Sequence, residues 1–171
     1  RSTTVSGNAR RDGVMNGFRP ARWLPGGHLQ TLFSPLLRRR PQLPRQRQRL
    51  ALSDGDFLDL DWYGPESTTG PCIILLHGLT GSAESPYILG QQQALAARGW
   101  RSVAVNWRGC SGEPNQRARS YHSGASDDLA EVVSHLRQQL PQHDLAAVGY
   151  SLGGNVLLKY LGERGADAGV A

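Results

Sequence analysis

The sequence predicts an α/β fold built on a mostly parallel sheet that is entered through an antiparallel hairpin. Three observations support this prediction. Residues 49–62 alternate between apolar and polar side chains around a glycine-containing turn, which is typical of a hairpin. Residues 72–76 are apolar without interruption, as in a strand buried on both faces. Strand-like and helical runs then alternate to residue 162, which indicates parallel β-α-β units.

The elements can be assigned in chain order. The hairpin has strands at 49–52 and 57–62, is polar on one side, and turns at Ser53-Asp54-Gly55. Pro71 precedes the buried strand 72–76, and a helix is expected from Tyr87 to Arg98 with Gly99 as its C-terminal cap.

The second half continues the alternation. The next strand is expected at 101–106, and a helix follows over 126–140, ended by Pro141. We expect Asp127 and Asp128 to cap the start of this helix. A short strand at 145–148 precedes a helix over about 154–162. One face of the 126–140 helix is apolar, with Leu129, Val132, Val133, Leu136 and Leu140.

Composition and charge suggest three regions. Residues 1–17 are expected to be a flexible lead-in, 18–49 an Arg-rich wrapping segment, and 50–171 the α/β domain. Residues 1–50 hold eleven arginines and one acid, whereas the rest holds eight basic and thirteen acidic residues. The hydrophobic fraction of 39% and the charged fraction of 19% are those of a globular protein.

The basic residues concentrate at Arg38-Arg39-Arg40 and in the alternating stretch 45–49. Such runs can bind nucleic acid or an anionic membrane surface, and they can also be a solvated arm. We favour the solvated arm, because no nucleic-acid-binding module accompanies the charge.

Other classes of protein are disfavoured. No apolar run approaches the roughly 18 residues of a membrane-spanning helix, and no secretory signal begins the chain. The two cysteines suit neither a disulfide framework nor a metal motif, and no phosphate-binding loop is present. We therefore expect a cytoplasmic protein without a metal or a cofactor, and the sequence gives no oligomeric state.

The stretch 149–153, Gly-Tyr-Ser-Leu-Gly, carries the clearest chemical signal. It matches G-x-S-x-G, in which a serine nucleophile occupies a strained turn between a strand and a helix. The glycines leave room where backbone approaches backbone. Here the motif lies between an apolar strand and an amphipathic helix, which is the context it requires. Ser151 is therefore the candidate catalytic nucleophile.

The loop that follows strand 72–76 would complete such a site. A loop in this position supplies one backbone N–H of an oxyanion hole, and the residue after the nucleophile supplies the other. This assigns the two donors to Leu79 and Leu152. His77 begins the loop, and we expect it to fix the shape of the loop rather than to act as a base.

Over about residues 18–171, the chain resembles the N-terminal half of the YheT-like esterase family of α/β-hydrolases. The matching phrases are Phe18-Arg19-Pro20, Trp23-Leu24-Pro25, His28-Leu29-Gln30-Thr31, Asp54 to Leu60, His77-Gly78-Leu79, Ser85-Pro86-Tyr87, Asn106, Arg108 to Gly112, Ser120 to Gly124, and Gly149 to Asn155. The resemblance implies an α/β-hydrolase fold and hydrolysis of carboxylic esters, either short acyl esters or acylglycerols, by a Ser-Asp-His triad without a cofactor. It also implies a small-molecule substrate.

The chain departs from that family in one respect. The triad order is serine, acid, histidine, yet all five histidines precede Ser151. We therefore expect the chain to be a fragment whose acid and base lie in a missing C-terminal part, with the 145–148 strand left at an exposed edge. By itself the chain would then be inactive. The alternative is that it is a truncated, catalytically inactive product or a non-enzymatic remnant.

Two residues remain as alternatives within the chain. His122 is the best candidate for a substitute base, although a role in ordering or lining the pocket is favoured. Cys110 could be a nucleophile, but it has no strained turn and no evident base. His135 and His143 are expected to face solvent.

Overall fold

The computed structural model describes residues 22–37 and 40–171, which divide between two compact units, residues 1–38 and 39–171. The predicted lead-in 1–17 and two residues of the Arg38-Arg39-Arg40 run lie outside the described residues. The first unit contains helix α1 (Gly27–Leu37), in a region where the sequence shows little periodicity. The rings of Trp23 and Phe33 meet edge to face within that unit, with centroids 4.8 Å apart.

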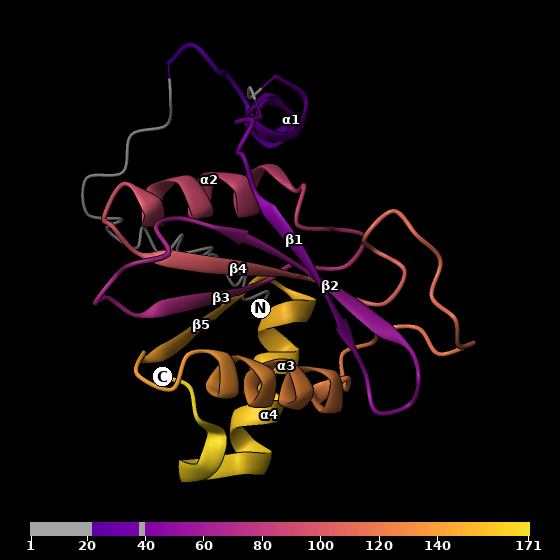
Figure 1. Ribbon diagram of the computed structural model, residues 1–171. Helices are drawn as coiled ribbons and strands as arrows, with labels where there is room; N and C mark the ends of the chain where they lie inside the picture. Colours follow the sequence, from indigo (N-terminus) through magenta and orange to yellow (C-terminus); the bar gives the residue numbers. More distant parts are fainter. Residues whose placement is uncertain (1–21, 38–39) are drawn as a thin grey trace, which may run out of the picture. The chain divides into compact units, whose positions relative to one another are not determined.

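The second unit is built on a five-stranded mixed sheet with the order β1-β2-β4-β3-β5 (Figure 1). The strands are β1 (Gln46–Ala51), β2 (Phe57–Tyr63), β3 (Cys72–Leu76), β4 (Arg101–Asn106) and β5 (Leu145–Gly149). β3 pairs in parallel with both β4 and β5, whereas β1 and β2 form the antiparallel hairpin. The predicted α/β fold with parallel inner strands is confirmed.

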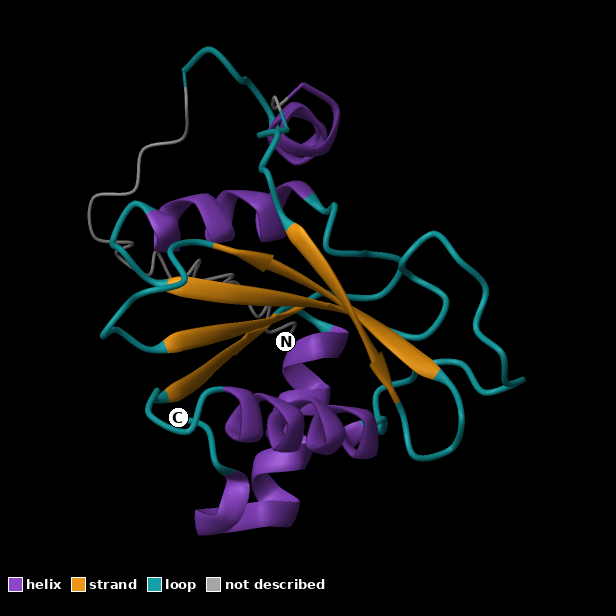
Figure 2. Cartoon of the chain, in the orientation of Figure 1, coloured by secondary structure: helices purple, strands orange, loops and turns teal. Residues whose placement is uncertain are grey.

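Helices cover both faces of this sheet (Figure 2). The helices are α2 (Pro86–Ala96), α3 (Ser126–Gln139) and α4 (Leu152–Arg164), followed by a 3-10 turn at Gly165–Ala168. α2 lies on one face, and α3 and α4 lie on the other. All five residues of β3 are buried, as its unbroken apolar sequence predicts.

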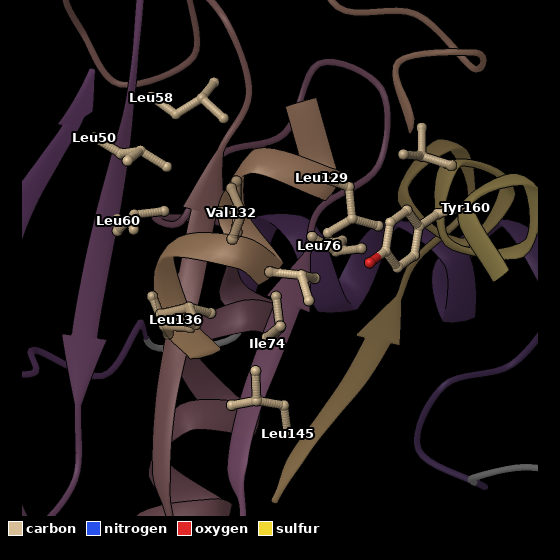
Figure 3. Close-up of a cluster of buried hydrophobic side chains, with 14 of the residues drawn as sticks. Leu50, Leu58, Leu60, Ile74, Leu76, Leu129, Val132, Leu136, Leu145 and Tyr160 are labelled. Atoms are coloured by element: carbon tan, nitrogen blue, oxygen red, sulfur yellow. The ribbon is translucent and has the colours of Figure 1, made fainter. Parts of the chain in front are cut away.

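Each face of the sheet has its own hydrophobic core. On the α2 face, Ile73 and Leu75 join a small cluster that includes Ile88 and Leu95. On the other face, Ile74 and Leu76 join a larger one beneath α3 and α4, drawn in Figure 3. Alternate residues of one strand therefore belong to different cores, which locks the register of β3.

The hairpin differs from the prediction on its polar side. Asp59 and Asp61 of β2 are 1% and 2% exposed. Each lies directly opposite an arginine of β1, in the pairs Arg49–Asp59 and Arg47–Asp61. The Arg47 guanidinium donates to both oxygens of Asp61 at 2.7 and 2.8 Å, and that of Arg49 donates to both oxygens of Asp59 at 2.8 and 3.0 Å.

These pairs correct the interpretation of the basic stretch 45–49. The strand begins at Gln46, so the stretch belongs to the sheet and not to a segment that ends at residue 49. Arg45 also has internal partners, since it donates to the Ala83 carbonyl at 2.9 Å and pairs with Glu84. The three alternating arginines neutralise carboxylates of their own domain and are not a solvated arm.

The start of α3 also differs from the prediction. Neither Asp127 nor Asp128 caps the helix, because the N-cap is Ala125 and no side chain bonds the helix terminus. Asp127 is exposed, whereas Asp128 is 1% exposed and pairs with Arg108. We call Arg108, Asp54, Asp56 and Asp128 the Arg108 network.

The edge of β5 that faces away from β3 is not bare. Ala171 donates to the Leu145 carbonyl at 2.9 Å and accepts from the Ala147 amide at 3.1 Å. These two bonds continue the sheet by a single residue beyond β5. The expectation of an exposed edge at 145–148 is therefore wrong for this part of the strand.

Candidate active site

The sheet topology brings two loops together at the carboxyl ends of β3 and β5. The strands are parallel neighbours in which Leu76 pairs with Gly149, so both end at the same level. The chain passes from β3 through α2 to β4, and then from β4 through α3 to β5. Strands β4 and β5 flank β3, so the chain reverses its direction across the sheet at β3. Ligands of open α/β sheets bind at such a switch point.

Ser151 occupies the strained turn that G-x-S-x-G predicts. It follows β5, immediately precedes α4, and has φ 50° and ψ −114°. A non-glycine residue held there costs on the order of 1–3 kcal/mol, so the surrounding backbone must enforce the conformation. The serine side chain is exposed at the end of the strand.

The flanking glycines explain how the turn is enforced. A Cβ atom on Gly149 would lie 2.6 Å from backbone atoms of Gly153 and Gly154. One on Gly153 would lie 2.5 Å from the Leu76 carbonyl oxygen. Both positions therefore admit only glycine, and the close approach joins the first turn of α4 to the end of β3.

The loop after β3 forms a tight turn over residues 78–81. The Gly81 amide donates to the Gly78 carbonyl at 3.1 Å, and Thr80 has φ 58°. A positive φ at this third position is what a type II turn requires, usually from glycine. Leu79 lies in the middle of the turn, and its amide donates no hydrogen bond within the described ranges.

The turn lies against the serine. A Cβ atom on Gly78 would lie 3.3 Å from Cβ of Ser151 and 3.2 Å from the Tyr150 carbonyl oxygen. The Leu152 amide is the first of α4 and, among residues 22–37 and 40–171, has no hydrogen-bond acceptor. The two predicted donors, Leu79 and Leu152, thus belong to adjoining backbone segments, both with free N–H groups.

His77 is fully buried and uses both ring nitrogens. Nδ1 donates to the Gly78 carbonyl at 2.8 Å, and Nε2 accepts the Trp107 amide at 3.3 Å. These bonds require the neutral ring, and burial lowers the pKa of His77, although the Gly78 bond opposes this shift. The Gly78 carbonyl and the Leu79 amide share one planar peptide unit, so a ring that holds the carbonyl also orients the donor.

Comparison with known proteins agrees with this geometry. Residues 71–167 match the family described as alpha/beta hydrolase fold. The chain belongs to the α/β-hydrolase family. It is 43% identical over 152 residues to the Escherichia coli protein named "Putative esterase YheT", covering 88% of this chain and 45% of that protein.

Other relatives extend the comparison. The human phospholipase ABHD3 is 33% identical, with 89% of this chain and 39% of that protein covered. The chain therefore spans less than half the length of these two relatives. A solved α/β serine hydrolase of Xanthomonas campestris matches with a TM-score of 0.59 and 24% identity, over 74% of this chain and 59% of that one. That likeness supports the fold.

Within residues 40–171, no histidine forms a hydrogen bond with the Ser151 side chain. His122 is exposed, and its Nδ1 accepts the Gly124 amide at 3.0 Å. The His122 loop does lie near the start of α4, since the Asn155 side chain donates to the Ser123 carbonyl at 2.9 Å. The structure thus brings His122 to the same edge of the sheet without pairing it with the serine.

His135 and His143 are half-buried rather than solvent-facing. His135 lies 3.2 Å from the Gln48 side chain, and burial lowers its pKa. His143 Nδ1 lies 3.1 Å from the Gly70 carbonyl. His135 thus joins α3 to β1, and His143 joins the loop before β5 to the loop before β3.

Cys110 does not have the environment of a nucleophile. Burial raises the pKa of its thiol, although a contact with Tyr121 opposes this shift. A raised pKa reduces the thiolate fraction on which cysteine reactivity depends. Cys72 is buried in β3, where burial raises its pKa to about 11.

Two tyrosines with no role predicted from the sequence contact the Gly78–Gly81 turn. The Tyr87 hydroxyl accepts the Gly78 amide, and the Tyr121 hydroxyl accepts the Thr80 amide. Both tyrosines lie in sequence segments that carry the family resemblance, and this was the only sign in the sequence of a role for them. Their spacing from Leu79 in sequence hides the contact.

The described ranges offer no cluster of three or more His, Cys, Asp or Glu side chains that could hold a metal ion. In the same ranges, no helix combines the length and the apolar character needed to span a membrane.

Proposed function

We propose that these residues form the nucleophile and the oxyanion hole of a serine-dependent carboxylic ester hydrolase. The observation that carries the proposal is the exposed Ser151 at φ 50° beside two backbone amides that have no acceptor in the described structure. Strained non-glycine residues cluster at functional sites, and free amides beside one can stabilise an oxyanion that forms there.

In the proposed reaction, Ser151 Oγ attacks the ester carbonyl carbon while a histidine takes the hydroxyl proton. The carbonyl oxygen gains negative charge and is held by the amides of Leu79 and Leu152. Each preorganised donor can contribute roughly 2.7–4 kcal/mol of transition-state stabilisation. The histidine then gives its proton to the alcohol, which leaves. Water, deprotonated by the same histidine, next attacks the acyl-serine, and the histidine returns the proton to Ser151 as the acid is released.

The acid and the histidine are proposed to come from outside the chain described here. In the described structure, His77 has both ring nitrogens in hydrogen bonds, His122 accepts a backbone amide, and neither forms a hydrogen bond with Ser151. The alternative is that the chain is a catalytically inactive remnant. Loss of the base from a serine triad lowers kcat by on the order of 10⁶, so these residues alone should be nearly inactive under either hypothesis.

The proposed substrate is a small ester with an apolar acyl group, either a short acyl ester or an acylglycerol. Leu79 is 64% exposed and Tyr87 is 39% exposed, and both contribute to or contact the turn that adjoins Ser151. Exposed apolar groups at a reactive centre favour an apolar ligand. We place the reaction in the cytoplasm, because Cys72 and Cys110 are free thiols.

The test is covalent labelling with a fluorophosphonate, followed by intact mass, for the wild type and for Ser151→Ala. Circular dichroism first establishes that both proteins are folded. Labelling that is lost in Ser151→Ala supports an activated nucleophile within these residues, and His122→Gln with Ser151 intact then tests His122 as the base. Folded protein that stays unlabelled means that the base is not among these residues, and the activity is then sought in the full-length protein.

A further inference from the structure

Two tyrosine hydroxyls from different elements hold the turn that carries the Leu79 amide. Tyr87, in the first turn of α2, accepts the Gly78 amide at 3.0 Å. Tyr121, in the loop between β4 and α3, accepts the Thr80 amide at 2.9 Å. The Leu79 amide lies between the two bonded amides and has no acceptor among the described residues.

These contacts act on three consecutive peptide units. Tyr87 holds the unit that precedes Gly78, and Tyr121 holds the unit that joins Leu79 to Thr80. The unit between them, which carries the Leu79 amide, is held at its Gly78 carbonyl by His77 at 2.8 Å and by the Gly81 amide at 3.1 Å. Because each unit is planar, the bonds determine where its free N–H points.

We propose that Tyr87 and Tyr121 are positioning residues that keep the Leu79 amide directed at the developing oxyanion. This inference rests on the proposed ester hydrolase function. Neither tyrosine is proposed to touch the substrate carbonyl, and each acts through the backbone of the turn.

Tyr121 holds the less favourable part of the turn, because Thr80 must adopt a positive φ. That region is unfavourable for a β-branched side chain. Type I and type II turns differ by rotation of the central peptide unit, which here joins Leu79 to Thr80, and the type I form gives the third residue a negative φ. The Tyr121 bond opposes that rotation, which would otherwise reverse the Thr80 N–H beside the donor.

The two rings are themselves held by aromatic contacts. The Tyr121 ring meets His77 edge to face, with centroids 6.1 Å apart. The Tyr87 ring packs on Tyr150, the residue before the nucleophile, with centroids 4.7 Å apart. Each hydroxyl therefore projects from a ring that is already fixed against the turn or against the serine, so little side-chain entropy opposes the bonds.

Tyr121 also connects the turn to the Arg108 network. Its loop begins beside Arg108, and Asn115 within that loop donates to Asp56 at 2.8 Å. The loop after β4 is therefore anchored at one end by buried charges and contacts the turn near the other. This gives a role to the Arg108 to Gly112 and Ser120 to Gly124 phrases, which contribute no reacting group.

The experiment compares Tyr87→Phe and Tyr121→Phe with Tyr63→Phe in the protein at its full natural length. The Tyr63 hydroxyl has no hydrogen-bond partner in the described structure, so its removal is a matched control. Amide hydrogen exchange at Gly78 and Thr80, followed by NMR, reports the bonds directly. Steady-state hydrolysis of a p-nitrophenyl ester reports kcat and KM, and urea denaturation reports stability.

We expect faster exchange at Thr80 in Tyr121→Phe and at Gly78 in Tyr87→Phe. We also expect kcat to fall about threefold to tenfold in each, with KM and the urea midpoint nearly unchanged. Unchanged exchange, or unchanged kcat despite faster exchange, overturns the positioning role. If the wild type hydrolyses no ester, the proposed function fails, while the exchange data still decide whether the tyrosines hold the turn.

Discussion

Arg108 and Asp128 form a two-pronged ion pair inside the domain. Arginine Nε and Nη2 each lie 2.8 Å from a carboxylate oxygen, and both side chains are 1% exposed. Arginine Nη1 reaches Asp54 at 2.8 Å and Asp56 at 3.1 Å. One cation thereby joins the hairpin turn, the loop after β4 and the first turn of α3.

We expect Asp128→Asn to lower the free energy of unfolding by about 3–5 kcal/mol, because it leaves part of a buried guanidinium without its partner. Asp127→Asn is the matched control, since its carboxylate is exposed on the adjacent residue. It should change the free energy of unfolding by less than about 0.5 kcal/mol. Urea denaturation at pH 7 measures both variants. Equal losses of stability in the two variants would contradict the Asp128–Arg108 pairing and favour helix capping by the two aspartates.

Removing an arginine of β1 should destabilise the hairpin. Arg47→Gln leaves Asp61, which is 3% exposed, without its bidentate partner. Because the guanidinium itself is 41% exposed and screened by solvent, we expect a loss of only about 1–2 kcal/mol. Arg98→Gln, at an exposed position after α2, should be neutral in the same urea titration. If Arg47→Gln leaves the free energy of unfolding unchanged, the arginines of 45–49 act as a solvated arm and do not stabilise the hairpin.

The strain at Ser151 should appear as a difference between two inactive variants. Ser151→Gly can adopt φ 50° without the Cβ penalty that Ser151→Ala retains. We expect Ser151→Gly to be more stable than Ser151→Ala by about 1 kcal/mol, and neither to react with a fluorophosphonate. Equal urea midpoints would mean that the turn relaxes when the serine is absent.

Acid should destabilise the protein in two stages. Burial lowers the pKa of His77 and of His135 below 6.5, so the unfolded chain binds protons before the folded one does. Stability is then greatest above pH 6.5 and falls as the pH drops below that value. Burial alone would raise the pKa of Asp56, yet hydrogen bonds from Gln116, Asn115, Phe57 and Arg117 hold it at about 2, against 3.8 when unperturbed. Its contribution is lost as the pH falls from about 4 to 2.

The measurement is the urea midpoint between pH 8 and pH 2. The decrease in the urea midpoint below pH 6.5 should be smaller in His77→Gln and in His135→Gln than in the wild type, whatever the absolute stability of each variant. A midpoint that stays constant from pH 7 to pH 5 in the wild type would contradict the first stage.

The regular part of the fold could be predicted from local patterns. The buried strand at Cys72–Leu76 has the predicted bounds, because its continuous apolar run leaves few alternatives, and the strand at Arg101–Asn106 also has the predicted bounds. α4 begins two residues earlier than its expected start at about 154, since Gly153 and Gly154 weaken the helical pattern while close backbone contacts require glycine there. The G-x-S-x-G context predicted the turn at Ser151 for the same steric reason.

Sequence reasoning failed where a charged residue has a partner far along the chain. Alternating arginines suggest a basic surface until the register places Arg47 and Arg49 opposite Asp61 and Asp59. Paired aspartates at a helix start suggest a cap until Arg108, twenty residues earlier, takes one of them. Local patterns report exposure and periodicity, whereas ion pairing depends on which strands become neighbours.

The two proposed oxyanion donors are main-chain groups, and this has an evolutionary consequence. Replacement of Leu79 or Leu152 by another residue alters what borders the substrate and leaves the N–H groups in place. Purifying selection should instead act on Gly78, His77 and the tyrosines that shape the turn. Acyl preference can therefore diversify among homologues at the positions that carry the donors, while the geometry of the donors is inherited through their neighbours.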